Sequence, residues 1–203
     1  PIFNQNGSGS CVAQTEAKEL GIMRWLKDGN YVHFSATDIY QRRANKPASG
    51  MNAADARAIM AKGATLEVLA PSQSMTDAQM DSAVVEPYKR EVGAVVSVPN
   101  YVEVPAKDID TVASIIQRTK KGVMLWFYFE NAEWDQWPRI VNESLNLSAP
   151  ATNRHSITGV DYALPEQALA THIQAVGRAI AEKRMYQMVA RFAASPQSLV
   201  SVA

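Results

Sequence analysis

Cys11 and His155 are the two side chains in this sequence whose types and surroundings best suit nucleophilic chemistry. Cys11 is the only cysteine among the 203 residues, and the thiolate form of a cysteine is a strong nucleophile. His155 opens a stretch that alternates like a β-strand, and an imidazole exchanges protons near neutral pH. A thiolate and an imidazolium stabilise each other's charge. Together they predict attack on a carbonyl carbon, with the imidazole moving the proton.

The residues around Cys11 favour a reactive thiol. A small-residue loop, Gly7-Ser8-Gly9-Ser10, leads into a helical pattern that begins at the cysteine. The unpaired N–H groups and the dipole at a helix N-terminus favour a thiolate, and glycines let the backbone approach a ligand closely. A lone cysteine is most often a small buried hydrophobic residue, and Gly-Ser loops are common linkers.

The spacing around Cys11 resembles the active-site segment of the papain family of cysteine peptidases. Gln5 stands six positions before the cysteine, and Gly9-Ser10-Cys11 adjoins the helix. The resemblance implies that the Gln5 side-chain amide and the Cys11 backbone N–H form an oxyanion hole. Two positions depart from the family: Ser8 replaces a disulfide cysteine, and Val12 replaces an aromatic residue.

A second segment carries the same resemblance. His155 lies 144 residues after Cys11, inside the range of ~130–150 residues for a papain-type histidine. The run that follows, ending at Tyr162, is similar to the histidine strand of the family. The resemblance implies that His155 is the catalytic histidine and that the enzyme needs no cofactor.

The resemblance also implies which residues line a cleft for a polypeptide substrate. A glycine turn before a helix lines one wall in the family, and here that turn contains Gly50 and Met51. Arg154 and Ser156, which flank the histidine, would line the other wall. Gly50 taken alone can equally be an ordinary turn glycine.

Composition excludes several other classes. With 20 basic and 20 acidic side chains the formal charge is zero, so the chain has no electrostatic footprint for nucleic acid or an anionic membrane. The longest apolar run, Val123–Phe129, is strand-sized, so no membrane span is expected. One cysteine cannot form an internal disulfide, which favours a reducing compartment or a fold without disulfides. Three scattered histidines give no metal-ligand spacing, and no metal is predicted.

The elements that must position these residues form an α+β fold. The expected arrangement is one papain-like domain over residues 1–203, with a mainly helical lobe (1–90) and an antiparallel β-rich lobe (91–203). The latter ends in a long helix after Pro165. Helical patterns begin at Cys11 and cover 38–43 after a Ser35 or Thr37 cap, 53–62 after Asn52, 74–84 and 108–121. β-Rich stretches cover 94–98, 101–104, Val123–Phe129 and 155–162.

One papain-family feature is missing. The family orients its catalytic histidine with a later asparagine, but no asparagine follows Asn153. Three explanations stay open. Another side chain takes the role, with Asp161, Glu166 and Gln167 nearest; the strands that carry it are missing after Leu164; or the site is degenerate. The family also has more residues before its glutamine, so a segment before Pro1 is expected to be missing as well.

The leading hypothesis is therefore a papain-like cysteine endopeptidase, a hydrolase that works through a thioester of Cys11. The alternative is a catalytically degenerate papain-like interaction domain within a larger assembly, with the C-terminal helix as a docking surface for a partner subunit. A third hypothesis is a thiol acyltransferase or transglutaminase-like enzyme, which passes the acyl group to an amine.

Overall fold

The computed structural model describes residues 4–93, 96–98, 100–105, 108–129 and 153–160. The chain forms two compact units. The first comprises Pro1–Trp126 with Ser156–Val160, and the second comprises Phe127–His155 with Asp161–Ala203. The long helix expected after Pro165 lies outside the described residues.

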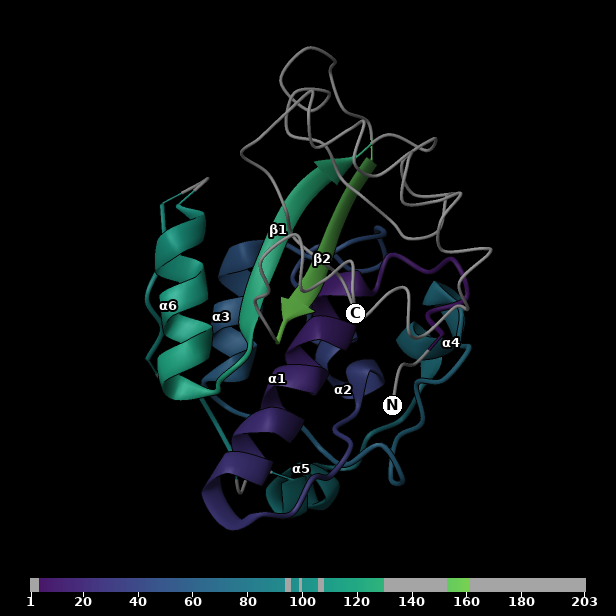
Figure 1. Ribbon diagram of the computed structural model, residues 1–203. Helices are drawn as coiled ribbons and strands as arrows, with labels where there is room; N and C mark the ends of the chain where they lie inside the picture. The colour runs from purple at the N-terminus through teal and green to yellow at the C-terminus, as the bar shows by residue number, and fades with distance from the viewer. Residues whose placement is uncertain (1–3, 94–95, 99, 106–107, 130–152, 161–203) are drawn as a thin grey trace, which may run out of the picture. The chain divides into compact units, whose positions relative to one another are not determined.

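The described residues form helices and a small sheet, so the α+β class is confirmed (Figure 1). The two strands are antiparallel neighbours. The elements are α1 (Cys11–Asp28), α2 (Ala36–Tyr40), α3 (Ala53–Met60), α4 (Asp77–Ser82), α5 (Pro87–Gly93), α6 (Ile109–Thr119), β1 (Val123–Phe129) and β2 (Asn153–Gly159). None of the helices described is long and apolar enough to cross a membrane.

Helix α1 is the central element of the first unit, and it contacts α2 and α3 (Figure 1). It ends at Asp28 because Gly29 adopts the left-handed conformation (φ 75°), from which its N–H donates to the Trp25 carbonyl. Its buried apolar face joins residues from the other helices in one core: Val12, Ala13, Ala17, Leu20, Phe34, Ile39, Tyr40, Met51, Ile59 and Met80.

Helix α2 is short and buried over its whole length. Ser35 caps it by accepting the Asp38 N–H at 3.0 Å. The buried Asp38 carboxylate forms ion pairs with Arg42 and Arg90 and accepts the Thr65 N–H at 3.0 Å. A buried charge is tolerated when it is paired and hydrogen-bonded in this way. Asp38 therefore ties the α2 region to two later segments of the chain.

Four sequence-based assignments of elements need correction. The 101–104 stretch and the described part of the 94–98 stretch, residues 96–98, are irregular rather than strands, because no described strand pairs with these β-prone residues. Helix α5 was not expected, although Pro87 at its first position is a helix-start signal. His155 is the third residue of β2 rather than the first residue of a strand.

Candidate functional site

Cys11 is the first residue of α1 and a free thiol of intermediate exposure. The preceding Ser10 is fully buried, and its hydroxyl lies 2.7 Å from the Ser8 hydroxyl instead of capping the helix. Thr15 donates its hydroxyl to the Cys11 carbonyl at 2.9 Å. The nucleophile predicted from the sequence thus lies at a helix start that is fixed from both sides.

Burial dominates the electrostatics of this thiol. It raises the pKa of Cys11 above the ordinary value, while the backbone N–H groups of Ser156, Val12 and Cys11 itself hydrogen-bond the sulfur and lower the pKa. Burial is the largest of these causes, and the net shift is upward. The backbone N–H groups at the helix start favour the thiolate, as expected, but burial outweighs them.

Strand β2 passes along the first turn of α1. The backbone N–H of Ser156 lies near enough to the Cys11 sulfur to lower the pKa of the thiol. Two residues later in β2, the Thr158 hydroxyl makes a long contact of 3.5 Å with the Thr15 carbonyl. The Ser156 side chain is buried, and its hydroxyl has no hydrogen-bond partner among the described residues. Of the residues predicted from the sequence, the structure brings Cys11 and Ser156 together.

Gln5 lies in the loop before α1, half-buried, and forms a tight turn with Ser8. The Gln5 carbonyl accepts both the N–H and the hydroxyl of Ser8, at 2.9 and 2.6 Å. The Gln5 side-chain amide donates to the Ser8 carbonyl at 2.9 Å. These hydrogen bonds hold the Gln5 side-chain amide within the loop that precedes Cys11.

The Gly50 turn has the conformation that glycine favours. Gly50 has a φ of 86°, its N–H donates to the Tyr40 hydroxyl at 3.0 Å, and its carbonyl accepts the Asn45 amide at 3.2 Å. Gly50 is half-buried, whereas the Met51 side chain is buried in the hydrophobic core. Only the backbone of this turn and the open space above Gly50 can therefore face a ligand.

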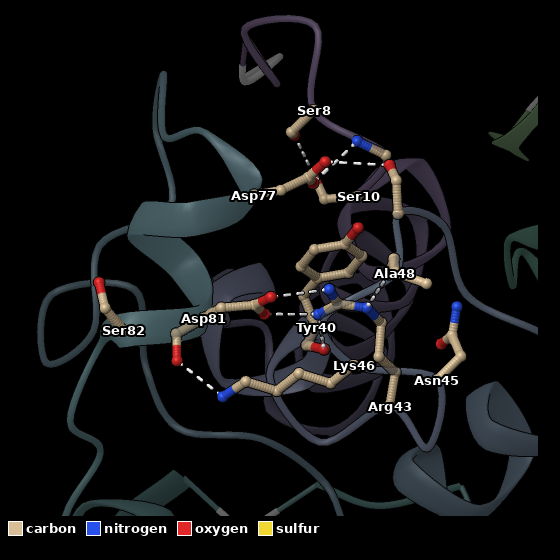
Figure 2. A network of polar contacts seen from close by, with 12 residues as sticks. Ser8, Ser10, Tyr40, Arg43, Asn45, Lys46, Ala48, Asp77, Asp81 and Ser82 are labelled. Atoms are coloured by element: carbon tan, nitrogen blue, oxygen red, sulfur yellow. Dashed lines mark hydrogen bonds and ion pairs between the residues drawn. The ribbon is translucent and has the colours of Figure 1, made fainter.

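Asp77, at the start of α4, joins the loop before Cys11 to the turn before Gly50. One carboxylate oxygen accepts the Gly9 N–H at 3.0 Å, and the other accepts the Ser49 hydroxyl at 2.9 Å (Figure 2). Burial raises the pKa of Tyr40, and a hydrogen bond from its hydroxyl to Asp77 raises it further. Sequence reasoning gave Asp77 no role, because its partners are distant along the chain.

His155 and Arg154 belong to the second unit, where His155 is half-buried and Arg154 is exposed. The pairing of Cys11 with His155 stays a prediction, as does the role of Arg154 in binding substrate. The candidates for orienting the imidazole, Asp161, Glu166 and Gln167, lie outside the described residues.

Helix α1 also buries two carboxyl groups that sequence reasoning missed. Glu16 is fully buried, and its oxygens have no hydrogen-bond partner among the described residues. Burial raises the pKa of Glu16 well above its ordinary value. Burial also raises the pKa of Glu19 to about 8, partly offset by a hydrogen bond from Thr158. The available signal was the position of Glu16 on the same helix face as Val12 and Leu20.

Within the described part of the chain, no group of three or more His, Cys, Asp or Glu side chains is arranged to hold a metal ion. No protein-family model matches the sequence, and no curated protein matches it either.

Proposed function

We propose that this protein is a papain-like cysteine peptidase, which hydrolyses peptide bonds with Cys11 as nucleophile and His155 as proton carrier. The observation that supports it most is the position of the Ser156 N–H, which lies near enough to the Cys11 sulfur to lower the pKa of the thiol. That nitrogen is bonded directly to the carbonyl carbon of His155. The resemblance requires Cys11 and His155 to lie near each other, although 144 residues separate them in the sequence. A contact between Cys11 and Ser156, the residue after His155, agrees with that requirement.

The proposed reaction forms and breaks one covalent bond to sulfur. The Cys11 thiolate attacks the carbonyl carbon of the peptide, and the Gln5 amide and the Cys11 N–H stabilise the resulting oxyanion. The His155 imidazolium gives its proton to the leaving amine, which departs and leaves a thioester. Water, deprotonated by His155, then attacks the thioester and releases the acid, which restores the thiol.

The raised pKa of Cys11 gives the imidazole a second task. A thiol that burial holds in its neutral form becomes a thiolate near neutral pH only if a cation stabilises it. An imidazolium at His155 would supply that charge. In this proposal the partner histidine sets the charge state of the nucleophile as well as moving protons.

By the resemblance, the Gly50 turn and the residues that flank His155 would both contact the substrate. Because the side chains of Met51 and Ser156 are buried, these two residues would offer their backbones to the substrate. The exposed Arg154 would offer a positive charge to an acidic group. This binding mode belongs to the proposed two-lobe papain-like arrangement, with a helical first lobe and a β-rich second lobe.

The decisive experiment measures the alkylation rate of Cys11 by iodoacetamide as a function of pH. As the only cysteine in the chain, Cys11 gives an unambiguous mass shift. The wild type should react at mildly acidic pH, and His155→Ala should slow that reaction at least tenfold, because only a paired thiolate reacts there. His33→Ala is the matched control, and it should keep the wild-type profile. A wild-type profile like that of an ordinary thiol, with no peptide cleaved from a library, would overturn the proposal.

The raised pKa of Cys11 also favours a second candidate function. A neutral buried thiol suits a catalytically degenerate papain-like domain that binds a partner subunit in a larger assembly. In that case Cys11→Ser would leave partner capture unchanged, while no peptide would be cleaved by the wild type.

A further inference from the structure

Helix α4 presents two carboxylates to two different segments. Asp77 and Asp81 are four residues apart and so lie on the same face of the helix. Asp81 holds the buried Arg43 guanidinium through two hydrogen bonds of 2.6 and 2.9 Å, and its carbonyl accepts the Lys46 ammonium at 2.7 Å (Figure 2). The fully buried Met80 lies between them in the sequence. Helix α4 is therefore anchored independently of Asp77.

Asp77 takes its hydrogen bonds from neutral donors. These are the Gly9 N–H and the Ser49 hydroxyl, and the Tyr40 hydroxyl lies close enough to Asp77 for the carboxylate to raise its pKa. Tyr40 in turn accepts the N–H of Gly50. We call these residues, Gly9, Tyr40, Ser49, Gly50 and Asp77, the Asp77 junction. A charged acceptor strengthens each of its hydrogen bonds relative to a neutral one.

The Asp77 junction leaves no spare room at Gly9. A Cβ atom added there would collide with the Ser49 hydroxyl and the Gly50 nitrogen, and it would lie 3.1 Å from the Tyr40 hydroxyl. The loop that ends at Cys11 therefore packs directly against the Gly50 turn. Gly9 lies two residues before the thiol, so a shift of this contact would move the start of α1.

We infer that Asp77 is a positioning residue for the nucleophile. By holding Gly9 and Ser49 at once, it keeps Cys11 at a fixed distance from the Gly50 turn, which is the proposed substrate wall. The inference rests on the proposed function.

The test compares three variants with the wild type. Asp77→Ala removes both the charge and the hydrogen bonds. Asp77→Asn removes the charge but keeps an oxygen for the Gly9 N–H and an amide that can pair with Ser49. Asp81→Asn is the matched control, because Asp81 binds Arg43 and Lys46 and makes no hydrogen bond to Gly9 or Ser49. Each protein is studied as the full chain, below its own unfolding temperature.

Two readouts separate positioning from general stability. The first is amide hydrogen exchange in the segments 6–10 and 48–51, which should become at least tenfold faster in Asp77→Ala and stay unchanged in Asp81→Asn. The second is the pH profile of Cys11 alkylation. Asp77→Ala should lower the rate at mildly acidic pH at least tenfold. Asp77→Asn should keep or raise that rate, because a nearby negative charge disfavours a thiolate.

The direction in which the alkylation rate changes tests whether Asp77 positions Cys11. If Asp77 acted on Cys11 only through its charge, both Asp77 variants would raise the alkylation rate, and that result would overturn the positioning role. Faster exchange with an unchanged alkylation profile would overturn it too. If the wild type alkylates like an ordinary thiol, the proposed function fails instead. The exchange data then decide alone whether Asp77 holds the two segments together.

Discussion

The backbone N–H of Ser156 lies near enough to the sulfur of Cys11 to lower the pKa of the thiol, so strand β2 meets the first residue of helix α1. This contact depends on the main chain of Ser156 and not on its side chain. The hydroxyl of Ser156 is buried and has no hydrogen-bond partner among the described residues. The main chain and the side chain of Ser156 therefore have separate effects, and a substitution that removes only the hydroxyl can distinguish them.

Ser156→Ala should leave the alkylation profile of Cys11 unchanged, because the N–H that meets the sulfur remains. The same change should be neutral or should stabilise the protein by up to roughly 1 kcal/mol, since it removes a buried hydroxyl that lacks a partner. Chemical denaturation and iodoacetamide kinetics measure the two effects. A loss of stability, or a shifted alkylation profile, would show that the hydroxyl has a function of its own.

Glu19→Gln should change how stability depends on pH. The pKa of Glu19 is about 8 in the folded protein, against an ordinary value of 4.5, so the folded state holds a proton that the unfolded state has lost between these values. Stability from this group is fully present below pH 4.5 and is lost as pH rises to about 8. The full pKa difference between 4.5 and about 8 corresponds to a loss of roughly 4–5 kcal/mol in the free energy of unfolding. Local hydration of the carboxyl makes the actual loss smaller.

The measurement for Glu19 is urea denaturation of the wild type and Glu19→Gln at several pH values between 4.5 and 8. The free energy of unfolding should depend less on pH in the variant than in the wild type. As pH rises, the variant should therefore become more stable relative to the wild type. Glu103→Gln, an exposed glutamate, is the matched control and should follow the wild-type curve. Parallel curves for Glu19→Gln and the wild type would contradict the prediction.

Asp38→Ala should destabilise the first unit by about 3–5 kcal/mol, because it strips a buried carboxylate from Arg42 and Arg90 and leaves the Thr65 N–H without its acceptor. The control is Asp28→Ala, which removes a partly exposed i,i+4 ion pair with Arg24. That change should cost about 0.5 kcal/mol or less. Equal losses in the two variants would show that Asp38 is not a structural centre.

Gly9→Ala should lower the free energy of unfolding by about 1–3 kcal/mol, because the new Cβ atom pushes the loop away from Ser49. The same displacement should change the alkylation profile of Cys11. Gly7→Ala is the comparison. Its Cβ atom meets nothing within 4 Å, but the φ of 68° strains any residue with a side chain, so it should cost roughly 1–2 kcal/mol. Gly7→Ala should leave the thiol unchanged, and a shift as large as that of Gly9→Ala would contradict the steric argument.

Local signals in the sequence predicted the elements that depend on local interactions. Asn52 caps α3 as expected, Thr76 starts α4 through a capping box, and Val123–Phe129 forms strand β1. Each of these signals lies within a few residues of the structure that it specifies. The end of α6 was also predicted within two residues. The sequence placed it at Lys121, and the helix ends at Thr119, where Lys120 takes the left-handed conformation.

Features that depend on distant contacts were not predictable in the same way. The β-prone 101–104 stretch is irregular, because a strand forms only where a partner strand is available. Burial raises the pKa of Cys11 because β2 and the core surround it, which the helix-start argument did not include. The Asp77 junction joins residues from four segments, and nothing in the spacing of Gly9, Ser49 and Asp77 indicates that they meet.

Helix α2 has five residues, far too few to hold a helical shape in water without support from elsewhere. Its support comes from the chain that follows: Thr65 and Arg90 both bind Asp38, and Ser35 donates its hydroxyl to the Ala70 carbonyl. A peptide trimmed to the loop and α1 would therefore lack the scaffold against which Cys11 is set. We expect the sulfur of such a peptide to behave like that of free cysteine, whatever the intact protein does.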